Sequence, residues 1–232
     1  MRAKLIESFE IAPAVRHFVF GVEGAGSFDF VPGQFVSFSA PVGGKTITRA
    51  YSLASPPGSP RFDLCLNRVE DGHLSPYLFA MRPGDGIEMQ PPLGLFTLRR
   101  PPRDSLLVAT GTGIAPFRSI LRSHLGDSSP AASPSFTLLF GVRHEAGLLY
   151  RSEFEEMSRR FPNFRFWPTL TRPAPGWTGR SGRVQAHLAE AIGERRDLDV
   201  FLCGLKLMVD SVRAILKQMG FDRKQIFYEK YD

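Results

Sequence analysis

The segment from Arg49 to Leu53 places a cation, an aromatic ring and a hydroxyl group close together in the chain. Residues of a strand alternate between its two faces, so Arg49 and Tyr51 share one face and Ser52 lies on the other. A flavin needs a cation for its pyrophosphate, an aromatic ring against its isoalloxazine and a small donor near its N5 atom. The segment therefore predicts a flavin site. A barrel strand with a surface Arg49 and a packed Tyr51 is the alternative that so short a pattern leaves open.

A second segment, Leu107–Pro116, begins as an apolar strand and turns through Gly111 and Gly113 into a helix. Backbone N–H groups and the dipole at a helix start attract phosphate, and glycines let a cofactor approach the backbone. This segment predicts a nucleotide pyrophosphate site, although many turns of this kind merely contain glycine. Cys203–Gly204 ends another expected strand, and its thiol would face the turn if the two strands are neighbours. A small buried thiol is the alternative.

Length and composition limit the number of domains and the class of protein. With 232 residues, of which 43% are hydrophobic, the chain is long enough for one large domain or two small ones. It contains no apolar run of about eighteen residues, so no transmembrane helix is expected. The segment Met1–Glu10 carries acidic residues and no long apolar core, so it does not resemble a signal peptide, and a cytoplasmic protein is expected.

The net charge of +6 points to an acidic partner. Nucleic acid is not expected as that partner, because the basic residues are scattered and form no basic tail, zinc finger or recognition helix. The two cysteines, Cys65 and Cys203, are too few for an iron–sulfur cluster or a zinc site. The histidines show no metal-ligand spacing, so no metal is predicted.

The chain changes character near Arg99. Residues 1–98 contain short alternating apolar runs between Pro and Gly, which predicts a small antiparallel β-barrel with a short helix at Leu74–Met81. The clearest expected strands in this part are Val15–Phe20, Gln34–Phe38, Phe62–Leu66 and Gly86–Met89.

Residues 99–104 are expected to be a linker. In residues 105–232, strand and helix patterns alternate, which predicts a Rossmann-like α/β domain with a parallel sheet. Ser152 and Glu155 predict a capping box at the start of one helix. The expected strands are Ser105–Ala109, Phe136–Phe140, Phe164–Leu170 and Asp199–Cys203, and the other expected helices are Ile114–Leu125, Val184–Ile192 and Met208–Met219.

Motifs in this order resemble the ferredoxin–NADP(+) reductase family, and in particular a bacterial stand-alone reductase without its own iron–sulfur domain. The resemblance spans nearly the whole chain. The motifs that carry it are Pro32–Phe35, Arg49–Leu53, Gly72–Ser75, Pro83–Asp85, Pro92–Phe96, Gly111–Pro116, Phe140–Arg143, Leu148–Tyr150 and Cys203–Met208.

The resemblance implies an FAD site in the barrel and an NADP(H) site in the α/β domain, with the isoalloxazine in a cleft between them. The residues implied for FAD are Arg49, Ala50, Tyr51, Ser52, Leu53, Gly72, His73, Leu74 and Ser75. Those implied for the nicotinamide cofactor are Thr112, Gly113, Ile114, Pro116, Cys203 and Gly204.

The same resemblance implies roles at the reacting centre. Ser52 would lie near flavin N5, and Cys203 beside the nicotinamide. Glu229 would be a carboxylate near the active site that takes part in proton or electron transfer with the partner. Tyr231 would shield the flavin until the nicotinamide replaces it, although Phe227 is also available for that task.

The coenzyme is a separate question, because the 2′-phosphate of NADPH needs cations. Arg143, Arg172 and Arg183 match basic positions of NADPH-using bacterial relatives, so NADPH is favoured and NADH stays possible. Three solvated arginines in a basic protein are the plain alternative.

These features together imply an FAD-dependent oxidoreductase that transfers electrons between NADP(H) and a one-electron carrier by hydride transfer to flavin N5. The expected carrier is an acidic ferredoxin or flavodoxin, and the protein is expected to be a monomer. Three alternatives stay open: an NADH-dependent reductase component of an oxygenase system, a flavin reductase, and a non-catalytic electron-transfer or assembly subunit.

Overall fold

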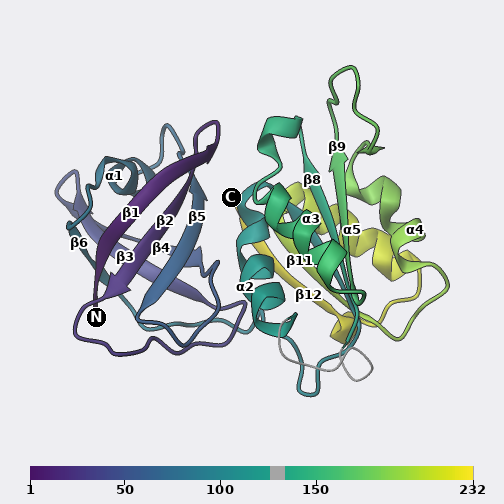
Figure 1. Cartoon of the computed structure of the whole chain (residues 1–232), viewed down its shortest axis with the longest axis horizontal. Coiled ribbons are helices and arrows are strands. Elements are labelled where there is room, and N and C mark those ends of the chain that lie inside the picture. Colours follow the sequence, from purple (N-terminus) through teal and green to yellow (C-terminus); the bar gives the residue numbers. More distant parts are fainter. Residues whose placement is uncertain (126–133, 232) are drawn as a thin grey trace. The chain divides into compact units, whose positions relative to one another are not determined.

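The computed structural model describes residues 1–125 and 134–231. Its residues group into two units, Met1–Thr97 with Ala115–Ser123, and Leu98–Ile114 with His124–Asp232 (Figure 1). Helix α2 (Ala115–His124) therefore groups largely with the first unit, although it follows the first strand of the second. The limits of 1–98 and 105–232 for two domains stay a prediction.

The first unit is built on a six-stranded sheet in the order β4-β3-β6-β1-β2-β5. All its neighbouring strands are antiparallel, and a bridge between Leu53 and Leu64 connects the chain just beyond β4 to β5 at the opposite edge. The sheet therefore closes as a barrel. Its elements are β1 (Arg2–Ala12), β2 (Val15–Val22), β3 (Phe35–Val42), β4 (Lys45–Ser52), β5 (Arg61–Asn67), helix α1 (Leu74–Ala80) and β6 (Gly86–Met89).

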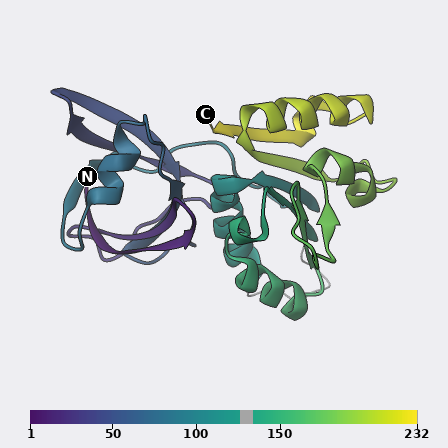
Figure 2. The same ribbon diagram turned by 90° about the horizontal axis from the view of Figure 1, so that it is seen from above.

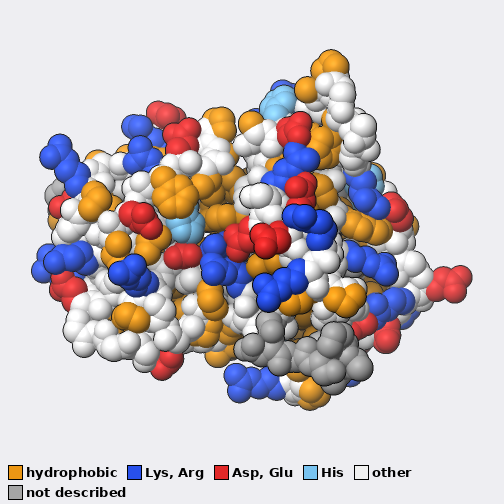
Figure 3. Space-filling view, viewed as in Figure 1, with side chains coloured by type: hydrophobic (Ala, Val, Ile, Leu, Met, Phe, Trp, Pro, Cys, Tyr) orange, Lys and Arg blue, Asp and Glu red, His pale blue; other side chains and the backbone are white. Residues whose placement is uncertain are grey.

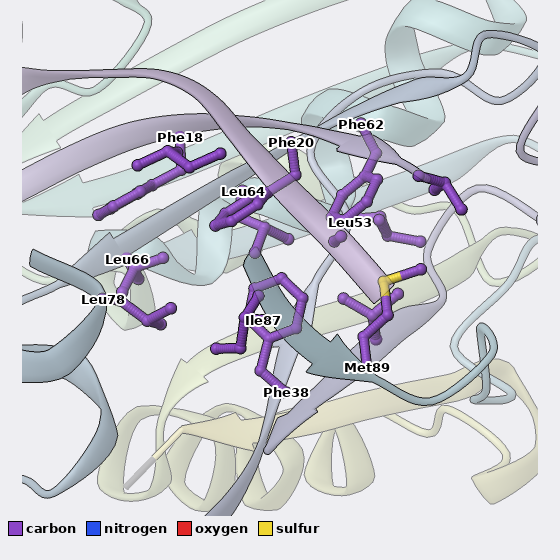
Figure 4. Packing of buried hydrophobic residues seen from close by; sticks show 14 of the residues in the cluster. Phe18, Phe20, Phe38, Leu53, Phe62, Leu64, Leu66, Leu78, Ile87 and Met89 are labelled. Atoms are coloured by element: carbon purple, nitrogen blue, oxygen red, sulfur yellow. The ribbon is translucent and has the colours of Figure 1, made fainter. Parts of the chain in front are cut away.

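Phenylalanines fill the inside of this barrel. The ring of Phe20 contacts Phe38 edge-on at 4.9 Å and stacks on Phe62 at 5.7 Å between ring centroids, and all three are fully buried. Such pairs each contribute about 0.5–1.5 kcal/mol beyond the area they bury. Leu53, the last residue of the predicted flavin motif, lies in the same core (Figure 4). The core thus fixes the end of the strand that carries the motif.

The second unit contains a parallel six-stranded sheet in the order β10-β9-β8-β7-β11-β12. The predicted fold class, an antiparallel barrel followed by a parallel α/β sheet, is confirmed. The strands are β7 (Ser105–Thr110), β8 (Phe136–Val142), β9 (Phe164–Leu170), β10 (Arg180–Ser181), β11 (Asp199–Leu205) and β12 (Ile226–Tyr231). The helices are α3 (Arg151–Arg160), α4 (Leu188–Ile192) and α5 (Lys206–Gln218), with short 3-10 turns η1 (Gly111–Ile114), η2 (Glu145–Gly147), η3 (Val184–His187) and η4 (Arg223–Gln225).

Helices cover both faces of the parallel sheet. Helices α4 and α5 pack on the face that carries Val108 and Leu202. Helix α3 packs through Phe154 against Phe164 and Phe166, which lie on the opposite face (Figure 2). This arrangement explains why β7, β8 and β11 are almost continuously apolar, since a strand buried on both faces has no polar side.

The predicted capping box at Ser152 is wrong. Helix α3 begins one residue earlier, at Arg151, and its N-cap is Tyr150 in a left-handed conformation with φ of 55° and no side-chain cap. The Nε atom of Arg151 instead donates to Glu155 Oε1 at 2.6 Å, so the glutamate pairs along the helix. The helix expected at Val184–Ile192 is also shorter, because it starts with η3 and only Leu188–Ile192 is α-helical.

Arg99 is anchored in the second unit by a buried carboxylate. Its Nε atom donates to Asp199 Oδ2 at 2.8 Å, and Asp199 is 1% exposed. Burial raises the pKa of Asp199, and Arg99 counteracts this rise. The Arg99 guanidinium also lies 5.1 Å from the ring centroid of Phe227, whose ring stacks on Phe201 at 4.5 Å.

Replacing Arg99 with alanine is expected to lower the free energy of unfolding by about 3 kcal/mol, because the change leaves a buried carboxylate without its cation. Urea denaturation measures this loss, and Arg223→Gln, an exposed arginine of the same unit, is the control. Adding Asp199→Asn should restore part of the loss. An Arg99→Ala protein as stable as the wild type would contradict this account of the anchor.

Candidate functional site

Strand β4 presents the predicted flavin residues. Arg49 is exposed, Tyr51 is half-buried with its ring 5.9 Å from Phe38, and Ser52 is 7% exposed. Burial raises the pKa of Tyr51 to about 12, and the nearby Arg49 lowers it slightly. The phenol is therefore neutral at physiological pH. The strand offers a solvent-exposed cation beside a neutral aromatic ring, which suits an anionic ligand with a flat ring system.

The Gly72–Ser75 segment is held in place by its own contacts. The Ser75 hydroxyl is buried and accepts a hydrogen bond from the Val69 N–H at 3.0 Å. A Cβ atom on Gly72 would lie 2.9 Å from Val69 Cβ and 3.1 Å from Ser75 Oγ, so only glycine fits. Ser75 thus shapes the turn before helix α1. A contact between this segment and the FAD pyrophosphate stays a prediction.

The glycine turn and Cys203–Gly204 meet at the carboxyl ends of two neighbouring strands. Strands β7 and β11 pair in parallel, with Cys203 opposite Ala109, so the two strands are neighbours, a point that the sequence left open. A Cβ atom on Gly113 would lie 2.3 Å from the Cys203 carbonyl oxygen, and one on Gly204 would lie 2.3 Å from Thr110 Oγ1. The two segments therefore pack backbone against backbone, which only glycines permit.

Gly111, at the start of this turn, is explained by its backbone conformation and not by close packing. Its φ is +55°, and a Cβ atom there would meet no other atom within 4 Å. Space beside the backbone at the carboxyl end of β7 is what a bound pyrophosphate requires. The turn itself is the 3-10 segment η1, and helix α2 follows it directly with Pro116 as its second residue.

Strand β12, which the sequence pattern did not predict, brings Glu229 and Tyr231 beside Cys203. Cys203 pairs with Glu229 across the two parallel strands, and its side chain is fully buried. Burial raises the pKa of the Cys203 thiol well above its usual value, the Glu229 carboxylate raises it further, and a hydrogen bond with Tyr231 acts in the opposite direction. Cys203 is therefore a neutral thiol at physiological pH.

The neutral thiol predicts a pH dependence of stability. An unfolded thiol ionises with a pKa of about 8.5, whereas the folded Cys203 stays protonated above that pH, so the stabilising contribution is lost as the pH rises. Between about pH 7 and pH 9.5, wild-type protein should lose about 1.4 kcal/mol more of its unfolding free energy than Cys203→Ser. Urea denaturation at both pH values measures the difference. Identical pH dependence in the two proteins would contradict a buried neutral thiol.

Three exposed arginines follow the carboxyl ends of β8, β9 and β10. The backbone N–H of Arg172 donates to the Arg143 carbonyl at 2.8 Å, which holds two of them side by side. Arg183 follows β10, whose Ser181 pairs with Leu170 of β9. Within the described part of the chain, none of the three guanidinium groups forms an ion pair or hydrogen bond. They are three exposed cations at one edge of the sheet.

The neighbouring arginines Arg151 and Arg180 differ in this respect. Arg151 forms ion pairs with Glu145 and Glu155, and Arg180 with Glu190 at 2.7 Å. Their charge is already balanced by carboxylates of the chain itself. Of these five arginines, the three that the sequence pattern selected are the ones without an ion pair among the described residues.

Sequence reasoning missed Asp63 and Arg118. Arg118, on helix α2, is 8% exposed and donates from Nη1 to Asp63 Oδ2 at 2.8 Å. The sequence does indicate that Arg118 is buried, because its spacing from Ile114, Leu121 and Leu125 puts it on the apolar side of the helix. A charged residue at such a position requires a buried partner.

The predicted site residues divide between the two units. Arg49, Tyr51 and Ser52 belong to the first unit, as does Pro116 of helix α2, whereas Cys203, Glu229, Tyr231 and the turn Gly111–Ile114 belong to the second. The cleft expected between them stays a prediction. Within residues 1–125 and 134–231, no three His, Cys, Asp or Glu side chains gather where they could hold a metal ion. In the same ranges no helix is long and apolar enough to cross a membrane.

Both halves of the chain match known domain families. Residues 2–98 match the model of the oxidoreductase FAD-binding domain, and residues 107–214 match that of the oxidoreductase NAD-binding domain. These matches agree with the division of the flavin motif and the glycine turn between the two units.

Two curated relatives align with most of this chain. The chain is 41% identical to ferredoxin–NADP reductase B of Sorangium cellulosum, with 99% of this chain and 97% of that protein aligned. It is 30% identical to the toluate 1,2-dioxygenase electron transfer component of Pseudomonas putida, over 87% of this chain and 59% of that protein's length. Its fold matches that of a ferredoxin NADP+ reductase from Neisseria gonorrhoeae with bound FAD and NADP. The TM-score is 0.86, the identity 24%, and the match covers 99% of this chain and 98% of the other.

Proposed function

We propose, from the premise that the chain belongs to the ferredoxin–NADP(+) reductase family, that it transfers electrons between NADPH and a one-electron carrier protein through FAD. The chain is an oxidoreductase with an FAD-binding and an NAD(P)-binding domain. The observation that carries the proposal is the backbone contact of Gly113 with Cys203 at the carboxyl ends of β7 and β11. This contact supports the proposal, because NAD(P)H reduction of a flavin requires the pyrophosphate and the nicotinamide of one coenzyme to bind next to each other.

The side chains would hold and orient the cofactors. Arg49 would neutralise the FAD pyrophosphate, Tyr51 would pack on the isoalloxazine, and Ser52 would donate a hydrogen bond near N5. When bound, FAD accepts a hydride and releases electrons singly. Cys203, as a neutral thiol, would pack beside the nicotinamide. Catalysis in this scheme comes mainly from orientation of the two rings.

Tyr231 is the better candidate for the aromatic cover of the flavin. The ring of Phe227 is already covered on one face by Phe201 and approached by Arg99. Tyr231 instead forms a hydrogen bond with Cys203, the residue proposed to lie beside the nicotinamide. A cover at that position would have to leave before the nicotinamide could stack.

NADPH is proposed as the preferred coenzyme because of Arg143, Arg172 and Arg183. They are exposed cations at one sheet edge without carboxylate partners among the described residues, which is what a 2′-phosphate requires. NADH has no such group, so the same arginines would give it little additional affinity.

The proposed carrier is an acidic ferredoxin or flavodoxin, and the protein would act as a cytoplasmic monomer. The net charge of +6 favours an acidic partner. On the face shown in Figure 3, Lys and Arg side chains are spread among Asp and Glu. The long-range attraction of the whole protein is therefore expected to matter more than a single basic patch. An oxygenase component is the second candidate carrier, because of the similarity to the toluate dioxygenase component.

Electron transfer to defined acceptors tests this proposal. With NADPH, the purified protein should keep FAD through gel filtration and should reduce an acidic ferredoxin or flavodoxin faster than it reduces free FMN. A protein that loses its flavin and reduces mainly free FMN would instead be a flavin reductase. A protein that prefers NADH and an oxygenase component would support the second candidate.

A further inference from the structure

Arg118 is a buried cation on the helix that directly follows the glycine turn. One nitrogen, Nη1, donates to Asp63 Oδ2 at 2.8 Å and to the Ala54 carbonyl at 2.9 Å. Asp63 lies on β5, and Ala54 follows the flavin motif Arg49–Leu53 without a gap. A single guanidinium on helix α2 therefore binds both the barrel wall and the chain just beyond the flavin motif.

Asp63 is itself bound to the segment after the flavin motif. The Ala54 N–H donates to the Asp63 carbonyl at 2.8 Å, and the Asp63 N–H donates to Ser55 Oγ at 3.0 Å. Two more side-chain nitrogen atoms lie near the same carboxylate oxygen, His17 Nε2 at 3.6 Å and Arg122 Nη1 at 3.9 Å. Asp63 is thus a rigidly held anion to which helix α2 attaches.

Packing alone already holds helix α2 on the barrel. The ring of Phe117 contacts Phe96 at 5.7 Å, and a Cβ atom on Gly33 would lie 3.5 Å from Ile120. A buried ion pair often adds little stability compared with apolar residues of the same size, but its directional hydrogen bonds can specify one geometry. The hydrogen bonds of the ion pair can therefore fix the orientation of helix α2 more strictly than the apolar contacts alone.

We propose that Asp63 and Arg118 form a positioning pair for hydride transfer. The glycine turn Gly111–Ile114 runs without a break into helix α2, so a helix fixed at Asp63 also fixes where that turn ends. The pair thereby fixes the first turn of helix α2, to which the nicotinamide-cofactor turn is joined. This inference rests on the proposed function. Because hydride transfer requires close alignment, a small displacement of the turn would slow the chemical step more than it weakens coenzyme binding.

Stopped-flow reduction by NADPH tests the pair, with the limiting rate of flavin reduction and the coenzyme Kd measured separately. Arg118→Gln and Asp63→Asn should each lower the limiting rate about tenfold or more, while the Kd for NADPH changes less than the rate does. Oxidation of the chemically reduced flavin by ferricyanide should be unchanged, because this step needs no nicotinamide. Combining both substitutions should cost little more than either one alone.

Arg122→Gln is the matched control, since it removes a positive charge from the same helix at a greater distance from the same carboxylate. It should keep the wild-type rate. Arg118→Lys keeps the charge but offers no planar fork, so it should fold and show an intermediate rate even where Arg118→Gln does not fold.

Normal reduction rates in Arg118→Gln, Asp63→Asn or Arg118→Lys, with only the Tm lowered, would overturn the positioning role and leave a structural ion pair. The same experiment judges the proposed function separately, through the wild type. If neither NADPH nor NADH reduces the wild type, the proposed function fails and the positioning pair fails with it. If the wild type is reduced normally and the variants match it, only the pair is refuted.

Discussion

Replacing Arg143 and Arg172 together with glutamine is expected to raise the Kd for NADPH by about a hundredfold or more and to leave the Kd for NADH nearly unchanged. Each lost charge-assisted hydrogen bond to a phosphate costs about 1.5–3 kcal/mol, which is roughly tenfold or more in affinity. The backbone bond between these two residues holds them together, so their effects should combine at one phosphate. Titration of the flavin absorbance with each coenzyme measures both constants.

Arg165→Gln is the matched control for this pair. It is an exposed arginine near the amino end of β9, whereas Arg172 follows the carboxyl end of the same strand. Arg165→Gln and Arg172→Gln each remove one positive charge from β9 or its end, but only Arg172 lies where the phosphate is proposed to bind. An equal loss of NADPH and NADH affinity in the double variant would contradict a 2′-phosphate site. So would an Arg165→Gln protein that weakens NADPH to the same extent.

Replacing Gly113 with alanine is expected to slow reduction of the flavin by both coenzymes about a hundredfold, with FAD still bound. The added Cβ atom would lie 2.3 Å from the Cys203 carbonyl oxygen and 2.6 Å from its carbonyl carbon, which is backbone that no rotamer change can move. The turn must therefore shift away from β11. The FAD residues belong to the other unit, so the protein should remain yellow.

Gly26→Ala is the control for this substitution, because a Cβ atom there meets nothing within 4 Å and its φ is not positive. It should reduce at the wild-type rate. The flavin content and the limiting rate are measured on the same samples. A Gly113→Ala protein with a normal rate for either coenzyme would show that the close packing of β7 on β11 does not position the nicotinamide.

The sequence predicted those parts of the fold in which one local signal dominates. The apolar run Leu106–Ala109 predicts a strand buried on both faces, and β7 is such a strand. The glycine turn and Cys203 could each be placed at the carboxyl end of a strand, where ligand sites in such sheets gather, whereas the pairing of the two strands comes from the structure. Both inferences depend on rules that need no knowledge of distant contacts.

The elements that were missed depend on tertiary contacts. Strand β12 is an edge strand with alternating exposed residues such as Tyr228 and Lys230, and its identity comes from pairing with β11. The capping box at Ser152 was predicted from a local sequence pattern. In the structure, Glu155 pairs with Arg151 instead, and Arg151 also pairs with Glu145. Neither outcome follows from the residues of that segment alone.

The candidate site shows the same division. The pattern of Arg49, Tyr51 and Ser52 could be read directly, since strand alternation fixes which residues share a face. The attachment of helix α2 through Arg118 could not, because its partner Asp63 lies 55 residues away in the sequence. Only the fold shows that these two residues meet.

The most direct test of the central claim is anaerobic stopped-flow reduction of the purified protein, with NADPH and NADH compared at matched concentrations. The account predicts a yellow protein that NADPH bleaches fast and NADH bleaches slowly. A reversed preference would agree with a flavoenzyme but would contradict the proposed binding of the 2′-phosphate by Arg143, Arg172 and Arg183. A colourless protein that binds no FAD, or a yellow one that neither coenzyme bleaches, would contradict the central claim.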